Sequence, residues 1–187
     1  MEKLLTYLNS IYSLSPELQE HLFGILKQQT LSRKQYLLKA EQVCNNIYFI
    51  SKGLVRCFYN KEDQEVNTWF MKEDDVIVSV ESFFYQKKSK EFIQAIEDTE
   101  LHSISYEELE YIYHTFPEFN FVARILLQKY YTLSEQRLYS LRMQRSQERY
   151  RYLMDYYPEL ILRVPAKFLA SYLGITEETL SRIRSKK

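Results

Sequence analysis

Two charged residues near the C-terminus have a spacing that suits hydrogen bonding to one extended ligand. Glu178 and Arg182 are four residues apart, which places both side chains on one side of a helix. A guanidinium can donate two hydrogen bonds to the O6 and N7 atoms of a guanine, and a carboxylate can accept one from a cytosine amino group. The pair therefore has the groups needed to read base edges in double-stranded DNA.

The rest of this segment offers further groups for contact with DNA. Arg184, Lys186 and Lys187 follow the pair, and we expect them to contact phosphates, which set affinity but not sequence. The full set of predicted DNA-binding residues is Thr176, Glu177, Glu178, Thr179, Ser181, Arg182, Arg184, Lys186 and Lys187.

Two short helices must position this segment. Pro165 suits a first helical turn, Gly174 suits the left-handed conformation at a helix end, and Thr176 suits the N-cap of a second helix. Phe168, Leu169, Tyr172 and Leu173 have the spacing of the first helix, and Leu180 and Ile183 are expected to pack against its Leu169 and Leu173. The pattern predicts a helix-turn-helix, whose second helix lies in the major groove. The alternative is an ordinary helical hairpin.

The distribution of charge favours the DNA-binding interpretation. From Arg142 to the end the chain has ten basic and five acidic residues, whereas residues 1–141 have fifteen basic and twenty acidic residues. The C-terminal part therefore carries a net charge of +5 on a chain whose net charge is zero. Such an asymmetry suits contact with phosphates, and a structural helix pair has no need of it.

Length and composition exclude several other classes of protein. The chain has 187 residues, of which 45% are hydrophobic and 27% charged, so it can bury a core in a medium domain and a small one. No apolar run approaches the roughly 20 residues that span a bilayer, and the N-terminus lacks the pattern of a signal peptide. We therefore expect a cytoplasmic protein with no membrane contact.

The cysteines and histidines give no sign of a metal site. Cys44 and Cys57 are two isolated residues among apolar neighbours, and we interpret them as free, buried thiols. The three histidines are scattered, so neither a metal ion nor another cofactor is expected. A cupin-like enzyme would need closely spaced histidines with a carboxylate, so the sequence predicts no enzymatic activity.

Earlier segments predict a roll of strands between helices. Residues 1–29 have the spacing of two helices, and residues 30–105 contain short β-branched and aromatic runs separated by polar turns. Those runs are IYFI, LVRCFY, VNTWFM, VIVSV, FIQAI and LHSIS. Gly53 falls between the first two runs, where we expect a tight hairpin turn. A helix over 106–115 and a long helix over 117–143 follow.

The long helix carries an apolar stripe that suggests a dimer. Val122, Leu126 and Leu133 lie on or near one side of it, and the stripe is longer than one small domain readily covers. We expect these three residues to pack against a second copy across a two-fold axis. The alternative is a helix buried entirely within one chain.

The order of these elements, together with IYFISKGLVRCFY and GITEETLSRI, resembles the Crp/Fnr superfamily of transcription regulators over essentially the whole chain. The resemblance implies an α+β fold with an N-terminal double-stranded β-helix (jelly-roll) sensor domain, a long dimerisation helix and a small C-terminal helix-turn-helix domain. The corresponding ranges are 1–116, 117–144 and 145–187. The partners implied are double-stranded DNA with a palindromic site, a second copy of the chain, a small-molecule effector and RNA polymerase.

The chain departs from the family pattern at the effector site and at the C-terminus. Members that bind cyclic nucleotides carry an Arg-Ser pair for the cyclic phosphate, and the corresponding stretch VIVSVESFFYQKKSKEFIQAI has no arginine. Glu81, Ser82 and Lys90 are the effector residues that the resemblance suggests, and cyclic AMP is not the expected effector. Glu177 occupies a position where relatives often have an arginine, and the chain lacks the β-hairpin wing, as in short Bacteroidetes-type members.

Two functions follow from these observations. The first is a dimeric, sequence-specific DNA-binding transcription regulator whose roll senses an effector. The alternative is a cyclic-nucleotide-binding signalling module that acts through partner proteins.

Overall fold

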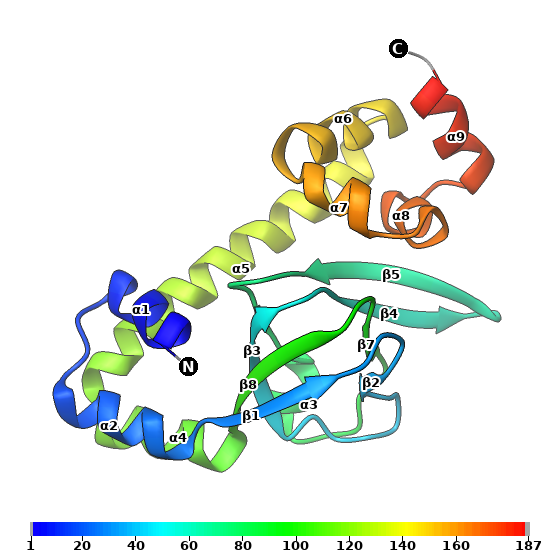
Figure 1. Ribbon diagram of the computed structural model, residues 1–187. Helices are drawn as coiled ribbons and strands as arrows, with labels where there is room; N and C mark the ends of the chain where they lie inside the picture. The colour runs from blue at the N-terminus through cyan, green and yellow to red at the C-terminus, as the bar shows by residue number, and fades with distance from the viewer. Residues whose placement is uncertain (1, 186–187) are drawn as a thin grey trace. The chain divides into compact units, whose positions relative to one another are not determined.

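The computed structural model describes residues 2–185, which form two compact units (Figure 1). The first, called here the roll unit, contains the residues up to Cys57 together with Met71–Gln128. The second, called the C-terminal unit, contains Phe58–Phe70 together with the residues from Lys129 onward. Each unit is described separately below.

Two helices precede the strands, as the sequence predicts. They are α1 (Glu2–Ile11) and α2 (Pro16–Ile25), and both bury leucines at helical spacing. Ser15 begins α2 as its N-cap, because its hydroxyl oxygen accepts a hydrogen bond from the Leu18 N–H at 3.2 Å. The same hydroxyl donates to a carboxylate oxygen of Glu118 at 2.6 Å, which ties the start of α2 to a later helix.

Over the described residues 2–185, eight strands form two four-stranded sheets, which confirms the predicted jelly-roll-like core. The first sheet has the order β1 (Lys27–Leu31), β8 (Thr99–Ser105), β3 (Asn46–Lys52) and β6 (Val76–Ile77). The second has the order β2 (Tyr36–Leu38), β7 (Phe92–Ala95), β4 (Val55–Lys61) and β5 (Gln64–Met71). Ile50 and Leu101 from the first sheet, and Val55 and Ile93 from the second, are completely buried.

Gly53 makes a different turn from the hairpin that the sequence suggests. That prediction is wrong because β3 and β4 belong to different sheets, so the turn carries the chain across the roll. Gly53 has a φ of 102°, and a Cβ there would lie 2.5 Å from Thr99 Oγ1 and 2.7 Å from the Asp98 carbonyl oxygen. Its N–H donates to a carboxylate oxygen of Glu73 at 2.8 Å. Only glycine fits this crossing.

The run VIVSV is also not a single strand. Strand β6 ends at Ile77, and the short helix α3 (Val80–Tyr85) begins three residues later. Ser82 and Phe83 are buried, whereas Val80 and Tyr85 are exposed, so helical packing of two side chains overrides the β-propensity of the valines.

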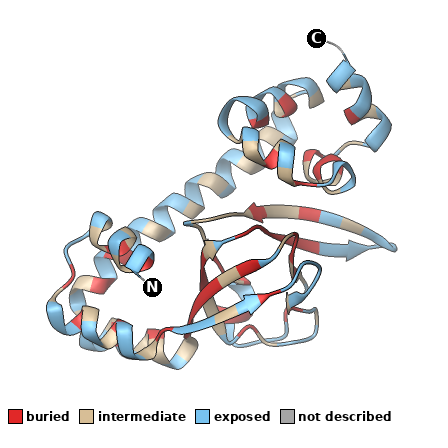
Figure 2. Ribbon diagram, in the orientation of Figure 1, coloured by how far each residue is buried: buried red, intermediate tan, exposed pale blue. Residues whose placement is uncertain are grey.

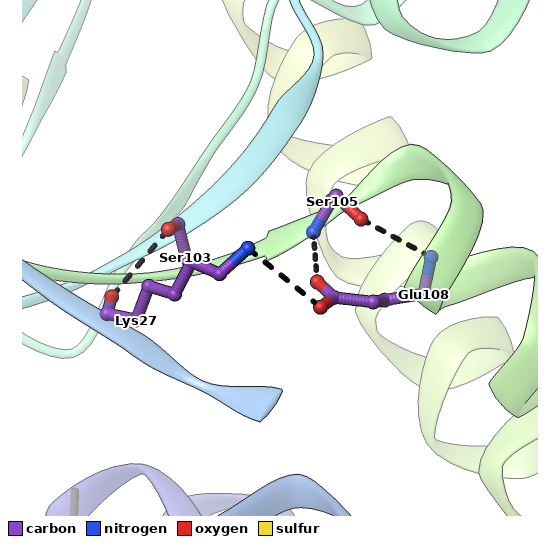
Figure 3. Close-up of polar contacts among 4 residues, drawn as sticks. All are labelled: Lys27, Ser103, Ser105 and Glu108. Atoms are coloured by element: carbon purple, nitrogen blue, oxygen red, sulfur yellow. Dashed lines mark hydrogen bonds and ion pairs between the residues drawn. The ribbon is translucent and has the colours of Figure 1, made fainter. Parts of the chain in front are cut away.

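Helix α4 (Tyr106–Thr115) occupies the predicted range and begins with a capping box (Figure 3). The Ser105 hydroxyl accepts from the Glu108 N–H at 3.2 Å, and the Glu108 carboxylate accepts from the Ser105 N–H at 2.9 Å. Lys27 Nζ lies 3.9 Å from the other Glu108 oxygen, and the Lys27 carbonyl accepts from the Ser103 hydroxyl at 3.4 Å. These contacts fasten α4 to β1.

The remaining helices are α5 (Pro117–Met143), α6 (Ser146–Tyr156), α7 (Pro158–Arg163), α8 (Ala166–Leu173) and α9 (Glu177–Ser185). Pro158 occupies the first turn of α7, where its missing N–H leaves no helical hydrogen bond unmade. Within residues 2–185, no helix is long and apolar enough to cross a membrane.

His102 supplies a pH-dependent contribution to stability. It is buried on β8, its Nδ1 lies 2.7 Å from the Ser51 hydroxyl, and burial lowers its pKa below the usual value of about 6.5. Near that pH the unfolded chain binds a proton that the folded chain does not, so the free energy of unfolding should fall as the pH drops from 7.5 to 5.5. Replacing His102 with Gln should weaken this dependence, measured by urea denaturation at both pH values.

The matched control is His114→Gln, at an exposed histidine. Carboxylates contribute equally in all three proteins, so the difference isolates His102. An unchanged pH dependence in His102→Gln would contradict the assignment.

Candidate nucleic-acid interface and the roll interior

The last two helices, α8 and α9, form what we call the C-terminal helix pair. Helix α8 ends in a Schellman motif, in which the Ile175 N–H donates to the Ala170 carbonyl and the Gly174 N–H to the Ser171 carbonyl, both at 3.0 Å. Gly174 has a φ of 64°, as predicted. The Thr176 hydroxyl accepts from the Thr179 N–H at 3.2 Å and begins α9.

Buried leucines set the rotation of α9 about its axis. Leu169 and Leu173 of α8 and Leu180 of α9 are at most 1% exposed. Because Leu180 faces inward, the residues around it turn toward solvent. The exposed side of α9 carries Glu177, Glu178, Ser181 and Arg182.

Glu178 and Arg182 lie together on this exposed side. The Arg182 Nε donates to the Glu178 backbone carbonyl at 3.4 Å. A hydrogen bond from the Thr176 side chain lowers the pKa of the Glu178 carboxyl, which keeps it ionised. The surface therefore presents a hydrogen-bond acceptor beside a hydrogen-bond donor, the combination expected for base edges.

The other predicted DNA-binding residues have mixed positions. Thr179 is half-buried, and its hydroxyl lies 3.2 Å from that of Thr176. The Arg184 guanidinium lies 6.0 Å from the ring centroid of Tyr150, so this side chain packs partly on α6. Lys186 and Lys187 lie outside the described residues.

Two arginines that the sequence analysis did not single out hold the C-terminal end of α8. Arg137 of α5 lies over the Tyr172 ring at 3.6 Å and donates to the Tyr172 carbonyl. The Arg149 Nε donates to the Leu173 carbonyl at 2.9 Å, and its Nη1 donates to the Gln144 carbonyl at 2.5 Å. Cations suit the last carbonyls of a helix. Arg149 was counted in the basic C-terminal part, and its charge serves the fold.

The three effector residues suggested by the sequence are not brought together. Glu81 is exposed and forms a 2.5 Å ion pair with Lys87, which lowers the pKa of its carboxyl. Lys90 is also exposed. Ser82 is buried, and its hydroxyl accepts from the Cys44 N–H at 2.9 Å and donates to the Lys87 carbonyl at 2.5 Å. Ser82 therefore organises the backbone.

Inside the roll lies a cluster of small polar groups that the sequence analysis missed. The hydroxyls of Ser79 and Ser89 are 3.1 Å apart, and the Ser89 hydroxyl also accepts from the Glu91 N–H at 3.0 Å. Burial raises the pKa values of the nearby Cys44 and Cys57 thiols. Both thiols are free and buried, as predicted.

Arg56 on β4 is the most informative residue that the sequence analysis missed. It is only 2% exposed, and its Nε and Nη2 donate to the Gln94 side-chain oxygen at 3.0 and 2.6 Å. Gln94 in turn donates to the Lys34 carbonyl at 2.9 Å. An arginine inside the apolar run LVRCFY was the available signal, because a charge within a buried strand needs polar partners.

Most of helix α5 after its first turns is exposed or half-buried (Figure 2), and its apolar residues differ in exposure. Val122 is fully buried against its own chain and has no surface left for a partner, so its assignment to an interface is corrected. Leu126 and Leu133 are half-buried. Large exposed residues instead recur at intervals of four, seven and three, namely Leu127, Tyr131, Leu138 and Leu141.

Residues 2–185 contain no group of three or more histidine, cysteine or acidic side chains that could hold a metal ion. No curated protein matches this chain. Residues 28–116 match the family model of the cyclic nucleotide-binding domain.

Several solved structures resemble most of the chain. A CooA mutant from Carboxydothermus hydrogenoformans is 22% identical, with a TM-score of 0.69 over 91% of this chain and 77% of CooA. The c-di-GMP-responsive regulator CLP from Xanthomonas campestris is 16% identical, with a TM-score of 0.73 over 92% and 91%. FixK2 from Bradyrhizobium japonicum is 20% identical, with a TM-score of 0.73 over 87% and 84%.

These similarities define the class of protein. They concern the domain formed by residues 28–116 and the fold of most of the chain. Residues 28–116 match the cyclic nucleotide-binding domain, and most of the chain has the fold of the Crp/Fnr transcription regulators, which confirms the resemblance seen in the sequence.

The role of Arg149 can be tested through stability. Replacing it with Ala should lower the free energy of unfolding of the C-terminal unit by about 2–3 kcal/mol, because two charge-assisted hydrogen bonds to carbonyls are lost. Urea denaturation followed by tryptophan fluorescence suits this measurement, since the single tryptophan, Trp69, belongs to the same unit. Arg142→Ala, at an exposed arginine of α5, should change stability by less than about 0.5 kcal/mol. Equal effects of the two substitutions would contradict the capping role.

Proposed function

We propose that this protein is a dimeric, sequence-specific DNA-binding transcription regulator in which the C-terminal helix pair acts as a helix-turn-helix. The observation that carries the proposal is the exposed side of α9, where Glu178 and Arg182 lie beside each other while Leu180 anchors the helix. The similarity of most of the chain to solved regulators supports it. The functional division into 1–116, 117–144 and 145–187 belongs to the same proposal.

In this proposal α9 enters the major groove. Arg182 donates to a guanine and Glu178 accepts from a cytosine, so both residues specify sequence. Lys167 is exposed in the first turn of α8. In a helix-turn-helix the first helix, here α8, crosses the DNA backbone, so Lys167 contacts a phosphate. The half-buried Arg149 takes no part, because its guanidinium already caps α8.

The proposed dimer forms through the exposed side of α5. Leu127, Tyr131, Leu138 and Leu141 follow the alternating spacing of a coiled-coil seam, with Ser134 at the remaining position. An apolar seam of this length is a poor surface to leave in water. Two-fold pairing along it would place two copies of α9 in successive major grooves about 34 Å apart, on a palindromic site with half-sites about 10 base pairs apart.

The effector in this proposal is a small molecule other than cyclic AMP. Glu81 and Lys90 lie at the surface, and the buried guanidinium of Arg56 is already bonded to Gln94. A cyclic phosphate would therefore have to displace protein contacts to gain a bidentate partner.

DNA reading is tested by comparing Arg182→Ala with Lys167→Ala. Loss of Arg182 should cost roughly 1–3 kcal/mol of binding and relax the preference at one position per half-site. Loss of Lys167 should weaken all sequences alike and make binding less salt-dependent. Fluorescence anisotropy on a selected genomic fragment and on a scrambled duplex, at two salt concentrations, measures both effects.

Equal weakening of both duplexes by Arg182→Ala would remove its base-reading role. If the unmodified protein bound no DNA at low salt and bound cyclic AMP at low micromolar concentration, the alternative would hold. That alternative is a cyclic-nucleotide-binding signalling module acting through partner proteins, and the family match of residues 28–116 favours it.

The dimer is tested by placing a charge in the seam. Leu138→Glu should yield monomers at micromolar concentration in sedimentation velocity, because pairing would bury two carboxylates without partners. Thr132→Glu, at an exposed position outside the seam, should remain dimeric. Dissociation by a charge at Leu133 with none at Leu138 would instead place the interface on the side first predicted from the sequence.

A further inference from the structure

The segment Phe58–Phe70, called here the arm, contains the end of β4 and nearly all of β5 (Figure 1). It turns at Glu62 and Asp63, which have φ values of 49° and 63°. Although its strands extend from a sheet of the roll, the arm belongs to the same compact unit as α8 and α9.

One hydroxyl fastens α8 to the arm. The Ser171 Oγ accepts from the Asn67 N–H at 3.0 Å and donates to the Glu65 carbonyl at 2.8 Å. Strand β5 is the last strand of its sheet, so hydrogen bonds on its outer edge must come from another element. A serine hydroxyl can donate and accept at once, and Ser171 therefore takes the place that a neighbouring strand would fill.

Aromatic packing extends this contact, by one residue along α8 and by three residues along β5. The rings of Phe70 and Tyr172 lie with centroids 5.1 Å apart, and Phe70 is buried. Arg137 covers the Tyr172 ring, as described above. The contact between the arm and α8 thus combines two directed hydrogen bonds with aromatic packing that is partly removed from water.

The arm carries the wrong charge for a neighbour of DNA. It contains one basic residue, Lys61, and three acidic residues, Glu62, Asp63 and Glu65. Lys167, the proposed phosphate contact, precedes Ser171 by four residues and so lies on the same side of α8. An acidic arm held at Ser171 therefore disfavours the approach of phosphates to that side of α8.

We propose that the arm is an autoinhibitory element, held on α8 through Ser171, which lowers the affinity of the helix pair for duplex DNA until it is released. This inference rests on the proposed DNA-binding function. If the arm is bound to α8 in most molecules, only the small fraction with a released arm can bind DNA. The apparent affinity for DNA is then lowered in proportion to that fraction.

The test uses Ser171→Ala in the full chain, with Ser171→Thr as the variant that keeps the hydroxyl and exposed Ser13→Ala as the matched control. Two measurements are made on each protein. Hydrogen exchange of the Asn67 amide reports whether the arm is bound to α8 through Ser171. Fluorescence anisotropy with a selected duplex reports the affinity for DNA. Alanine suits a helix, so Ser171→Ala should fold.

Loss of the two hydrogen bonds should speed exchange at Asn67 and raise the affinity for DNA about 3- to 30-fold. Ser171→Thr and Ser13→Ala should match the unmodified protein in both measurements. The double substitution Glu62→Gln with Asp63→Asn should raise the affinity for DNA at low salt, because it reduces the repulsion between the arm and DNA phosphates. The Asn67 amide should stay protected from exchange, because the hydrogen bonds to Ser171 remain.

Faster exchange at Asn67 with unchanged or weaker DNA binding would overturn the autoinhibitory role and leave Ser171 as a positioning residue. Unchanged hydrogen exchange at Asn67 in Ser171→Ala would show that Ser171 does not hold the arm on α8. If every protein, including the unmodified one, bound no duplex, both the proposed DNA-binding function and the autoinhibition would be wrong. The hydrogen-exchange data would still show whether Ser171 holds the arm on α8.

Discussion

The crossing at Gly53 is the constraint on which the arrangement of the roll depends. A side chain there would collide with Thr99 and the Asp98 carbonyl, so the chain can pass between the sheets only with glycine at this position. Because the turn sends β4 into the second sheet, Arg56 comes to lie opposite Gln94 on β7. The same strand continues into the arm, whose far edge Ser171 completes.

Burial decides which arginines are available for a ligand. Arg56, Arg137 and Arg149 are each held by amide or carbonyl oxygens, and a guanidinium removed from water needs such acceptors around it. Arg182 is exposed and touches only the backbone of its own helix in the contacts described above. Net charge therefore locates a basic region correctly but overstates the number of groups that can meet a phosphate.

Helix α5 illustrates how one helix serves two surfaces. The half-buried residues Leu126 and Leu133 lie on one side, and the exposed residues Leu127 and Leu138 lie on another. Both sets are apolar, and both follow spacings near the helical repeat. An apolar stripe in the sequence therefore predicts a packing surface. Only the packing of the chain decides whether that surface is buried within the chain or stays exposed for a partner.

Much of the architecture could be predicted because it depends on local rules. The Ser105 and Glu108 capping box, the end of α8 at Gly174 and the start of α9 at Thr176 each follow from side chains within a few residues. The order of the elements also identified the fold, and the inward position of Leu180 fixed which side of α9 meets solvent.

What the sequence by itself determined about this protein was thus the identity of its elements and the exposed pair Glu178 and Arg182. Only the tertiary structure decided the sheet that receives β4, the burial of Arg56 and the use of Ser171 at the edge of β5. The physical reason is that these features join residues separated by 38 to 106 positions, as in the Arg56–Gln94 and Glu65–Ser171 contacts. No local propensity encodes such a pairing, which depends on how the whole chain excludes water.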